Sequence, residues 1–244
     1  MDARHRVVGP DGAVRQVSET LNVLVKTPGS VGTAGRPARA ALPPTRGAPV
    51  TGVGDGVGGW VGGPVVPIPT GSVVMLVGPP ASGKSMFAAE LVRQDKVDAG
   101  AVLSSDDIAV ELFGPTVDRD VADPEIFAER DRRLAQRLAT GQTAVVDATN
   151  VLPQARAQLA AIARRFGAPV VVLRFGQPHA VLAAQNAGRD KRLPARQVRE
   201  YAALMAAHAT AEQLRAEGAC AVHDVPGRDE QVTPAQAAHR FVFV

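Results

Sequence analysis

Cysteine is almost missing from this 244-residue sequence, because Cys220 is the only one. A single cysteine excludes an intrachain disulfide, and no histidine partner pattern accompanies it, as a catalytic thiol would need. His179, His208 and His223 lack the spacing of metal ligands. The sequence therefore predicts neither a disulfide scaffold nor a thiol enzyme nor a histidine-rich metal centre.

Long apolar runs are also missing. No stretch approaches the roughly 20 apolar residues that a helix needs to cross a bilayer, and the polar start, Met1 to Arg6, is unlike a signal peptide. Aromatic residues are few, with Trp60 and Tyr201 the only ones of their kinds, so no stacking platform for single-stranded nucleic acid is evident. These absences predict a cytoplasmic, soluble protein with no membrane partner.

The main part of the chain lacks net charge. Residues 1–69 hold seven Lys and Arg against four Asp and Glu, whereas residues 70–244 hold twenty of each. The formal net charge of +3 therefore comes entirely from the first segment. A basic domain would have supported a polynucleotide partner, but a neutral one neither supports nor excludes it.

The composition divides the chain in two. Residues 1–69 are rich in Gly, Pro, Ala and Val with few large side chains, which predicts a low-complexity, largely disordered extension. Alternating apolar residues within 5–26 are compatible with a short hairpin. The run Gly54 to Gly59 formally matches Gly-x-Gly-x-x-Gly, but no strand precedes it and we discount it. Residues 70–244 are expected to form the folded domain.

Short apolar runs alternate with helical patterns throughout that domain. The expected strands cover 73–77, 101–104, 143–146, 170–175 and 219–225. The expected helices cover 84–92, 125–139, 153–166, 178–187 and 195–216. Wholly apolar strands separated by helices indicate an α/β fold, a doubly wound parallel sheet with helices on both faces.

The most informative motif follows the first of these strands. It reads Gly-Pro-Pro-Ala-Ser-Gly-Lys-Ser and fits the Walker A pattern Gly-x4-Gly-Lys-Ser/Thr without substitution. A strand before it and a helix after it indicate a P-loop, in which backbone amides face an anion at a helix N-terminus. The candidate nucleotide-binding residues are Gly78, Pro79, Pro80, Ala81, Ser82, Gly83, Lys84, Ser85 and Met86.

Carboxylates follow two other strands. Because ligands collect at the carboxyl ends of parallel strands, these acids are expected to flank the phosphates. Asp147 has the Walker B position and, with Ser85, is the candidate Mg²⁺ site. Asp106 is placed to act as general base on an acceptor hydroxyl, although capping of the next helix is an alternative for it. For Asp107 capping is the favoured interpretation.

Two arginines, Arg189 and Arg192, lie late in the domain. On a helix, residues three apart would share a face. Paired guanidiniums suit phosphate oxygens, so we expect an arginine-bearing lid, with a solvated charged turn as the alternative.

The order of these motifs resembles the polynucleotide 5′-kinase branch of P-loop kinases, which are similar to zeta-toxin-like and AAA-type ATP-binding proteins. The segments are the P-loop, Leu-Ser-Ser-Asp-Asp, Val-Val-Asp-Ala-Thr-Asn with Arg156 after it, and Asn-x-x-Arg-x-x-Arg-x-Pro, within about residues 70–217. The resemblance implies that Lys84 and Ser85 hold the triphosphate and metal, that Asp106 activates a 5′-hydroxyl, and that Arg189 or Arg192 is the lid arginine. The family usually has an arginine three residues after the catalytic aspartate, where this chain has Ala109.

These observations together predict an ATP- and Mg²⁺-dependent phosphotransferase, with Lys84, Asp106, Arg189 and Arg192 as the catalytic candidates. A polynucleotide 5′-hydroxyl is the first expected acceptor. A small-molecule hydroxyl, on a metabolite, antibiotic or nucleotide sugar, is the alternative. A third hypothesis is an ATP-binding or ATPase protein without an acceptor. The preference between ATP and GTP and the oligomeric state stay open.

Overall fold

The computed structural model describes residues 6–8, 14–16, 63–116, 119–190 and 192–244. Within these ranges the helices are α1 (Lys84–Arg93), α2 (Ser105–Phe113), α3 (Arg119–Ala139), α4 (Pro153–Phe166), α5 (His179–Ala187), α6 (Ala195–His208), α7 (Ala211–Ala216) and α8 (Pro234–His239). Short 3₁₀ turns occupy Ala99–Ala101 and Arg228–Glu230.

Five parallel strands form the central sheet, in the spatial order β5-β6-β4-β7-β8. They are β4 (Val73–Val77), β5 (Val102–Ser104), β6 (Ala144–Asp147), β7 (Val170–Arg174) and β8 (Ala221–Asp224). β4 lies at the centre with a neighbour on each side, which explains why all five of its residues are buried. The strand order reverses direction beside β4, and this is where a doubly wound sheet binds ligands.

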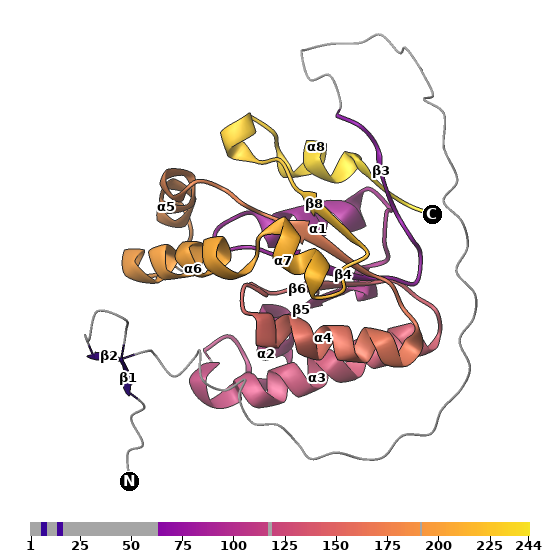
Figure 1. The fold of residues 1–244 in the computed structure, drawn as a ribbon, viewed down its shortest axis with the longest axis horizontal. Coiled ribbons are helices and arrows are strands. Elements are labelled where there is room, and N and C mark those ends of the chain that lie inside the picture. Colours follow the sequence, from indigo (N-terminus) through magenta and orange to yellow (C-terminus); the bar gives the residue numbers. More distant parts are fainter. Residues whose placement is uncertain (1–5, 9–13, 17–62, 117–118, 191) are drawn as a thin grey trace.

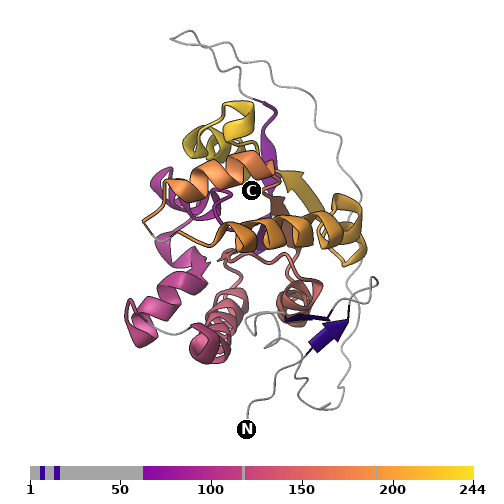
Figure 2. The same cartoon turned by 90° about the vertical axis from the view of Figure 1, so that its left-hand side faces the viewer.

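Helices cover both faces of this sheet (Figure 1). On one face Val74 and Leu76 of β4 pack in a cluster with residues of α1 and α8. On the other face Val73, Met75 and Val77 pack in a cluster with residues of α3, α4, α6 and α7. The view turned by 90° shows the same layers from the side (Figure 2). The predicted fold class is confirmed.

A separate pair of parallel strands closes one corner of the domain. β3 (Val66–Ile68) pairs with β9 (Phe241–Phe243), and Thr70 N–H donates to Val244 O at 2.7 Å. Ile68 is fully buried. The division between an extension and a domain at residue 70 stays a prediction, but β3 is part of the folded core although it precedes that boundary.

Much of the expected extension lies outside the described residues. β1 (Arg6–Val8) and β2 (Val14–Gln16) pair antiparallel, within the range in which a hairpin was considered. The Gly54–Gly59 motif is not among the described residues. In the described part of the chain, no helix combines the length and the apolar character that a bilayer span requires.

The expected helix ranges did not include α2 or α8, and two of the expected helices differ in extent from the structure. The sequence predicted a helix over 125–139, whereas α3 already begins at Arg119 and contains Pro124. The extra turn packs Ala122 against Ile108 and Ala109 of α2, which offsets the hydrogen bond that proline cannot make. The helix expected over 195–216 is two helices, because Thr210 starts α7 with a capping box.

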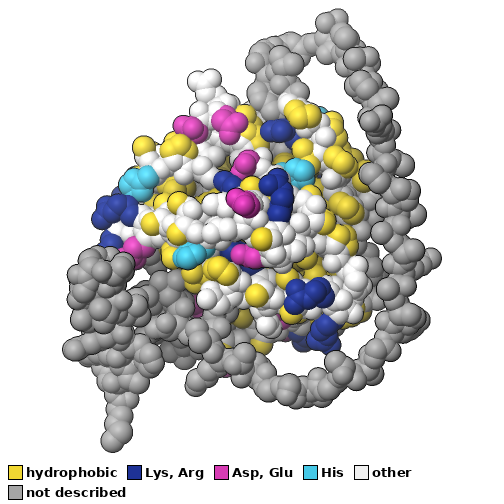
Figure 3. Space-filling view, viewed as in Figure 1, with side chains coloured by type: hydrophobic (Ala, Val, Ile, Leu, Met, Phe, Trp, Pro, Cys, Tyr) yellow, Lys and Arg dark blue, Asp and Glu magenta, His cyan; other side chains and the backbone are white. Residues whose placement is uncertain are grey.

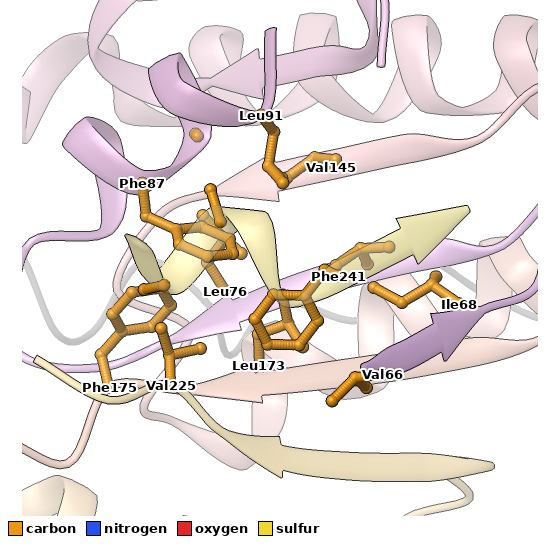
Figure 4. Packing of buried hydrophobic residues seen from close by; sticks show 14 of the residues in the cluster. Val66, Ile68, Leu76, Phe87, Leu91, Val145, Leu173, Phe175, Val225 and Phe241 are labelled. Carbon is orange, nitrogen blue, oxygen red and sulfur yellow. The ribbon is translucent and has the colours of Figure 1, made fainter. Parts of the chain in front are cut away.

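Three phenylalanines anchor the first helix to the sheet (Figure 4). The ring of Phe87 on α1 lies edge-on to Phe175, with centroids 5.4 Å apart, and to Phe241, at 5.5 Å. Such pairs add to the stabilisation from burial. Phe87 therefore joins the helix that follows the P-loop to the end of β7 and to the β3–β9 corner.

Phe87→Ala should lower the free energy of unfolding by about 3–5 kcal/mol, because it leaves a cavity at this junction. Urea denaturation measures the change. Phe166→Ala is a matched control, since this ring is 38% exposed and should cost much less. Equal losses in both variants would contradict the anchoring role.

Candidate nucleotide-binding and phosphotransfer site

The P-loop joins the end of β4 to the start of α1. Gly83 has φ of +95° and is the residue before the helix, a backbone conformation that glycine adopts without strain. A Cβ atom on Gly78 would lie 2.8 Å from Phe175 Cβ and 3.0 Å from Phe175 O. The backbone geometry therefore explains both fixed glycines of the motif. Gly83 makes the turn before the helix, and Gly78 lies too close to the residue after β7 for a side chain to fit.

Lys84 lies at the first position of α1 with its side chain folded into the loop. Its ammonium donates hydrogen bonds to Gly78 O at 2.9 Å and Pro79 O at 2.7 Å, and contacts Ser82 Oγ at 3.3 Å. The residue is 6% exposed. Burial lowers the pKa of Lys84 to about 8, while Asp147 and Asp106 raise it and Arg189 lowers it. The charges of Asp147, Asp106 and Arg189 thus all influence the pKa of Lys84.

The two predicted metal ligands are neighbours. The hydroxyl of Ser85 donates to the carboxylate of Asp147, and burial at the end of β6 raises the pKa of Asp147 while this bond lowers it. A hydroxyl and a carboxylate are the hard oxygen donors that Mg²⁺ prefers. No group of three or more His, Cys, Asp or Glu side chains that could hold a metal occurs among the described residues. This donor set fits an ion that completes its shell with waters and phosphates rather than a protein cage.

Asn150 stabilises the strand end that leads into the P-loop, and the sequence analysis did not predict this role. Its side-chain amide donates to Leu76 O of β4 at 2.9 Å, and its φ of +47° is a left-handed conformation that asparagine tolerates. Beside it, Gly78 N–H donates to Thr149 O at 3.0 Å. The segment after β6 therefore fixes both the end of β4 and the first residue of the loop.

Arg156 of α4 extends this support, although the sequence marked it only through the family resemblance. Its guanidinium donates to Asn150 O at 2.9 Å, to His208 O at 2.6 Å and to Glu217 at 2.6 and 2.7 Å. The side chain is 2% exposed. A buried charge of this kind needs full pairing, which the three partners supply.

Asp106 lies in the first turn of α2 at the carboxyl end of β5. Its charge raises the pKa of both Lys84 and Asp147, which places it within electrostatic reach of the P-loop. The cap of α2 is Ser104, whose hydroxyl accepts from Asp107 N–H at 3.1 Å. The capping interpretation of Asp107 is therefore wrong, and Asp106 is not the cap either. Both carboxylates are exposed.

The two arginines of the expected lid lie in the connection between α5 and α6. Neither is helical, so the shared helix face does not occur. Arg189 is exposed, and its positive charge lowers the pKa of Lys84, which indicates that it lies within electrostatic range of that ammonium. Arg192 is exposed as well, and no such coupling to Lys84 accompanies it. Lys and Arg side chains gather at the end of the molecule where α5 and α6 lie (Figure 3).

The lowered pKa of Lys84 predicts a pH dependence of nucleotide binding. In the nucleotide-free protein the ammonium loses its proton above about pH 8, whereas phosphate anions favour the charged form. Binding therefore takes up a proton, and affinity for Mg-ATP should fall by up to about tenfold per pH unit above pH 8. Calorimetric titrations from pH 7 to 10 test this. In Lys84→Arg the slope should vanish, because a guanidinium stays charged; a persisting slope would contradict the assignment.

Among the similar solved structures, one reaches a TM-score of 0.50 and supports the fold. The Pnkp1/Rnl/Hen1 RNA repair complex includes a chain with a TM-score of 0.50 and 20% identity, covering 57% of this protein. This protein covers 45% of that chain, less than half of its length. A putative kinase from Chloroflexus aurantiacus gives 0.49 with 14% identity over 69% of this chain and 92% of its own. Shikimate kinase from Acinetobacter baumannii gives 0.45 with 16% identity over 69% and 89%.

Comparison with curated protein sequences gives no match. The sequence model of the AAA domain family matches residues 73–214, from the first strand of the central sheet to α7. That range contains the P-loop, both strand-end carboxylates and the arginine-bearing connection described above. The chain thus belongs to the AAA domain family, with the fold of a P-loop kinase.

Proposed function

We propose that the protein is an ATP-dependent phosphotransferase that moves the γ-phosphoryl group to a hydroxyl acceptor. One observation carries this proposal: the ammonium of Lys84 is buried in a P-loop and is acted on by Asp147, Asp106 and Arg189. These charges come from separate parts of the sequence. A binding site for a triphosphate needs the lysine, but an acceptor base and a lid cation are features of transfer chemistry.

The proposed roles follow from where each side chain lies. Ser85 and Asp147 would hold Mg²⁺, which when bound offsets charge on the phosphate oxygens. Asp106 accepts the proton of the acceptor hydroxyl as the new P–O bond forms and the bond to the β–γ bridging oxygen breaks, leaving ADP. Lys84 and Arg189 stabilise the charge that develops on the transferred group and the leaving oxygen.

The first acceptor candidate is a polynucleotide 5′-hydroxyl. It is supported by the order of the four motifs along the chain, and Asp106 lies at an exposed position at the start of α2. The RNA repair chain, at 20% identity, contributes likeness of fold only.

The second candidate is the hydroxyl of a small molecule, and a particular observation favours it. Ala109 is 2% exposed, in a cluster with Ile108, Ala122 and Ile126. An arginine could not replace it without opening that cluster. α2 carries no cation at all, and Val110 and Phe113, one and two turns after Asp106, are exposed. α2 therefore has no cationic side chain for an acceptor phosphate, but its exposed apolar side chains suit an acceptor with an apolar surface.

One experiment separates these alternatives. The protein is incubated with γ-labelled ATP and Mg²⁺, in parallel with a 5′-hydroxyl oligonucleotide and with a panel of small alcohols. Label on the oligonucleotide supports the first candidate, and label on a small alcohol alone supports the second. Release of phosphate without any labelled acceptor would favour the third hypothesis, an ATPase, and would contradict the proposed transfer.

A further inference from the structure

One side chain, that of Asn186, forms hydrogen bonds across the connection between α5 and α6. Asn186, in the last turn of α5, donates its amide to Leu193 O at 2.8 Å and accepts from Leu193 N–H at 3.1 Å. The two residues are seven positions apart, and Pro194, the next residue, is the N-cap of α6. Asn186 therefore binds both backbone groups of Leu193 in the way that a neighbouring strand would.

Asparagine is suited to this contact. It carries a donor and an acceptor on one planar group, and Leu193 presents the complementary pair. Asn186 is 7% exposed, so its polar atoms need partners inside the protein. Aspartate has nearly the same shape but two acceptors, and would face Leu193 O without a donor.

The segment that this contact closes carries Arg189. The backbone N–H of Arg189 donates to Asn186 O at 3.2 Å, so Asn186 binds Arg189 through its main chain and Leu193 through its side chain. Gly188 N–H donates to Gln185 O at 3.2 Å in the same turn. The start and the end of the segment are both fixed relative to α5.

We propose that Asn186 is a positioning residue that holds the Arg189 segment in the conformation from which its guanidinium reaches the nucleotide phosphates. This inference rests on the proposed function, because it assigns Arg189 to the phosphates. We call the two hydrogen bonds between Asn186 and Leu193 the Asn186 clamp. Without this clamp, the exposed Arg189 stays tethered to α5 through its backbone, but its side chain samples many orientations.

A double-mutant cycle tests the proposal. Asn186→Ala is expected to lower the rate of ATP turnover by about 10–100-fold, as displacement of a catalytic group by about 1 Å does, with a smaller change in the KM for ATP. Arg189→Ala should cause a similar loss. In the Arg189→Ala background, Asn186→Ala should have no further effect, because the group that it positions is gone.

Two further variants complete the design. Asn186→Asp preserves side-chain shape and the bond from Leu193 N–H, so it replaces the alanine variant if that one fails to fold, and it should lose turnover to a similar extent. Arg196→Ala removes a 73%-exposed arginine on α6, outside the clamped segment, and should leave turnover unchanged. The melting temperature of every variant is measured in parallel.

The outcomes are distinct. Equal losses from Asn186→Ala with and without Arg189 would overturn the positioning role, as would a fall in melting temperature with unchanged turnover. If the unmodified protein turned over no ATP, the proposed function would fail instead. The same cycle would then be read in the affinity for a non-hydrolysable ATP analogue. Non-additive losses would support the clamp, and additive losses would overturn it.

Discussion

Lys84→Ala is expected to abolish ATP-dependent turnover, with a fall of at least about 10²–10³-fold, because it removes the cation that the P-loop directs at the phosphates. The fold should persist, since the substitution takes a buried charge out of the core instead of introducing one. Phosphate release and Mg-ATP titration calorimetry measure the two effects, and circular dichroism checks the fold.

The matched control is Lys96→Ala, a half-buried lysine just beyond the end of α1. It should bind and turn over ATP as the unmodified protein does. If Lys84→Ala bound Mg-ATP as tightly as the unmodified protein, the nucleotide would lie elsewhere. The roles proposed for the residues around the P-loop would then be wrong.

Asp106→Asn is expected to lower phosphoryl transfer by about 10²–10⁴-fold, the usual contribution of a general base. Mg-ATP affinity should change little, because the residue is exposed at the start of α2 and its proposed partner is the acceptor hydroxyl rather than the nucleotide. Transfer from γ-labelled ATP to whichever acceptor is labelled measures the rate.

Asp107→Asn is the matched control one residue further along. Its carboxylate is also exposed, and the helix cap belongs to Ser104, so the substitution removes the same charge without removing a base or a cap. Comparable losses in the two variants would mean that general electrostatics, rather than proton transfer at Asp106, governs the rate. An unchanged rate in Asp106→Asn would remove this residue from the mechanism.

The parts of the fold that the sequence predicted are those set by local patterns. Val73 to Val77 is a short apolar run ending at a glycine loop, and it forms the central strand. The P-loop, with Lys84 starting a helix, follows from the motif and its flanks. Short-range patterns of this kind are sufficient because strand burial and loop geometry depend on adjacent residues.

The parts that the sequence did not predict depend on distant partners. Arg156 binds groups 52 and 61 residues away, and no local pattern encodes those contacts. The early start of α3 depends on packing against α2, which outweighed the usual position of Pro124. The Asn186 clamp joins two residues that are seven positions apart across the end of α5, which helical periodicity does not predict. The site roles of Asp106, Asp147, Arg189 and Arg192 stay predictions that the variants above address.

The β3–β9 pair has a consequence for biosynthesis. Val66 and Ile68 leave the ribosome early, but their partner strand is encoded more than 170 residues later, at Phe241. At roughly 5–20 residues per second, about 9–35 s pass before that partner exists. Throughout this interval Val66 and Ile68 lack the strand with which they pair in the folded domain. Completion of this corner is therefore coupled to translation of Phe241 rather than to the folding of the nucleotide site.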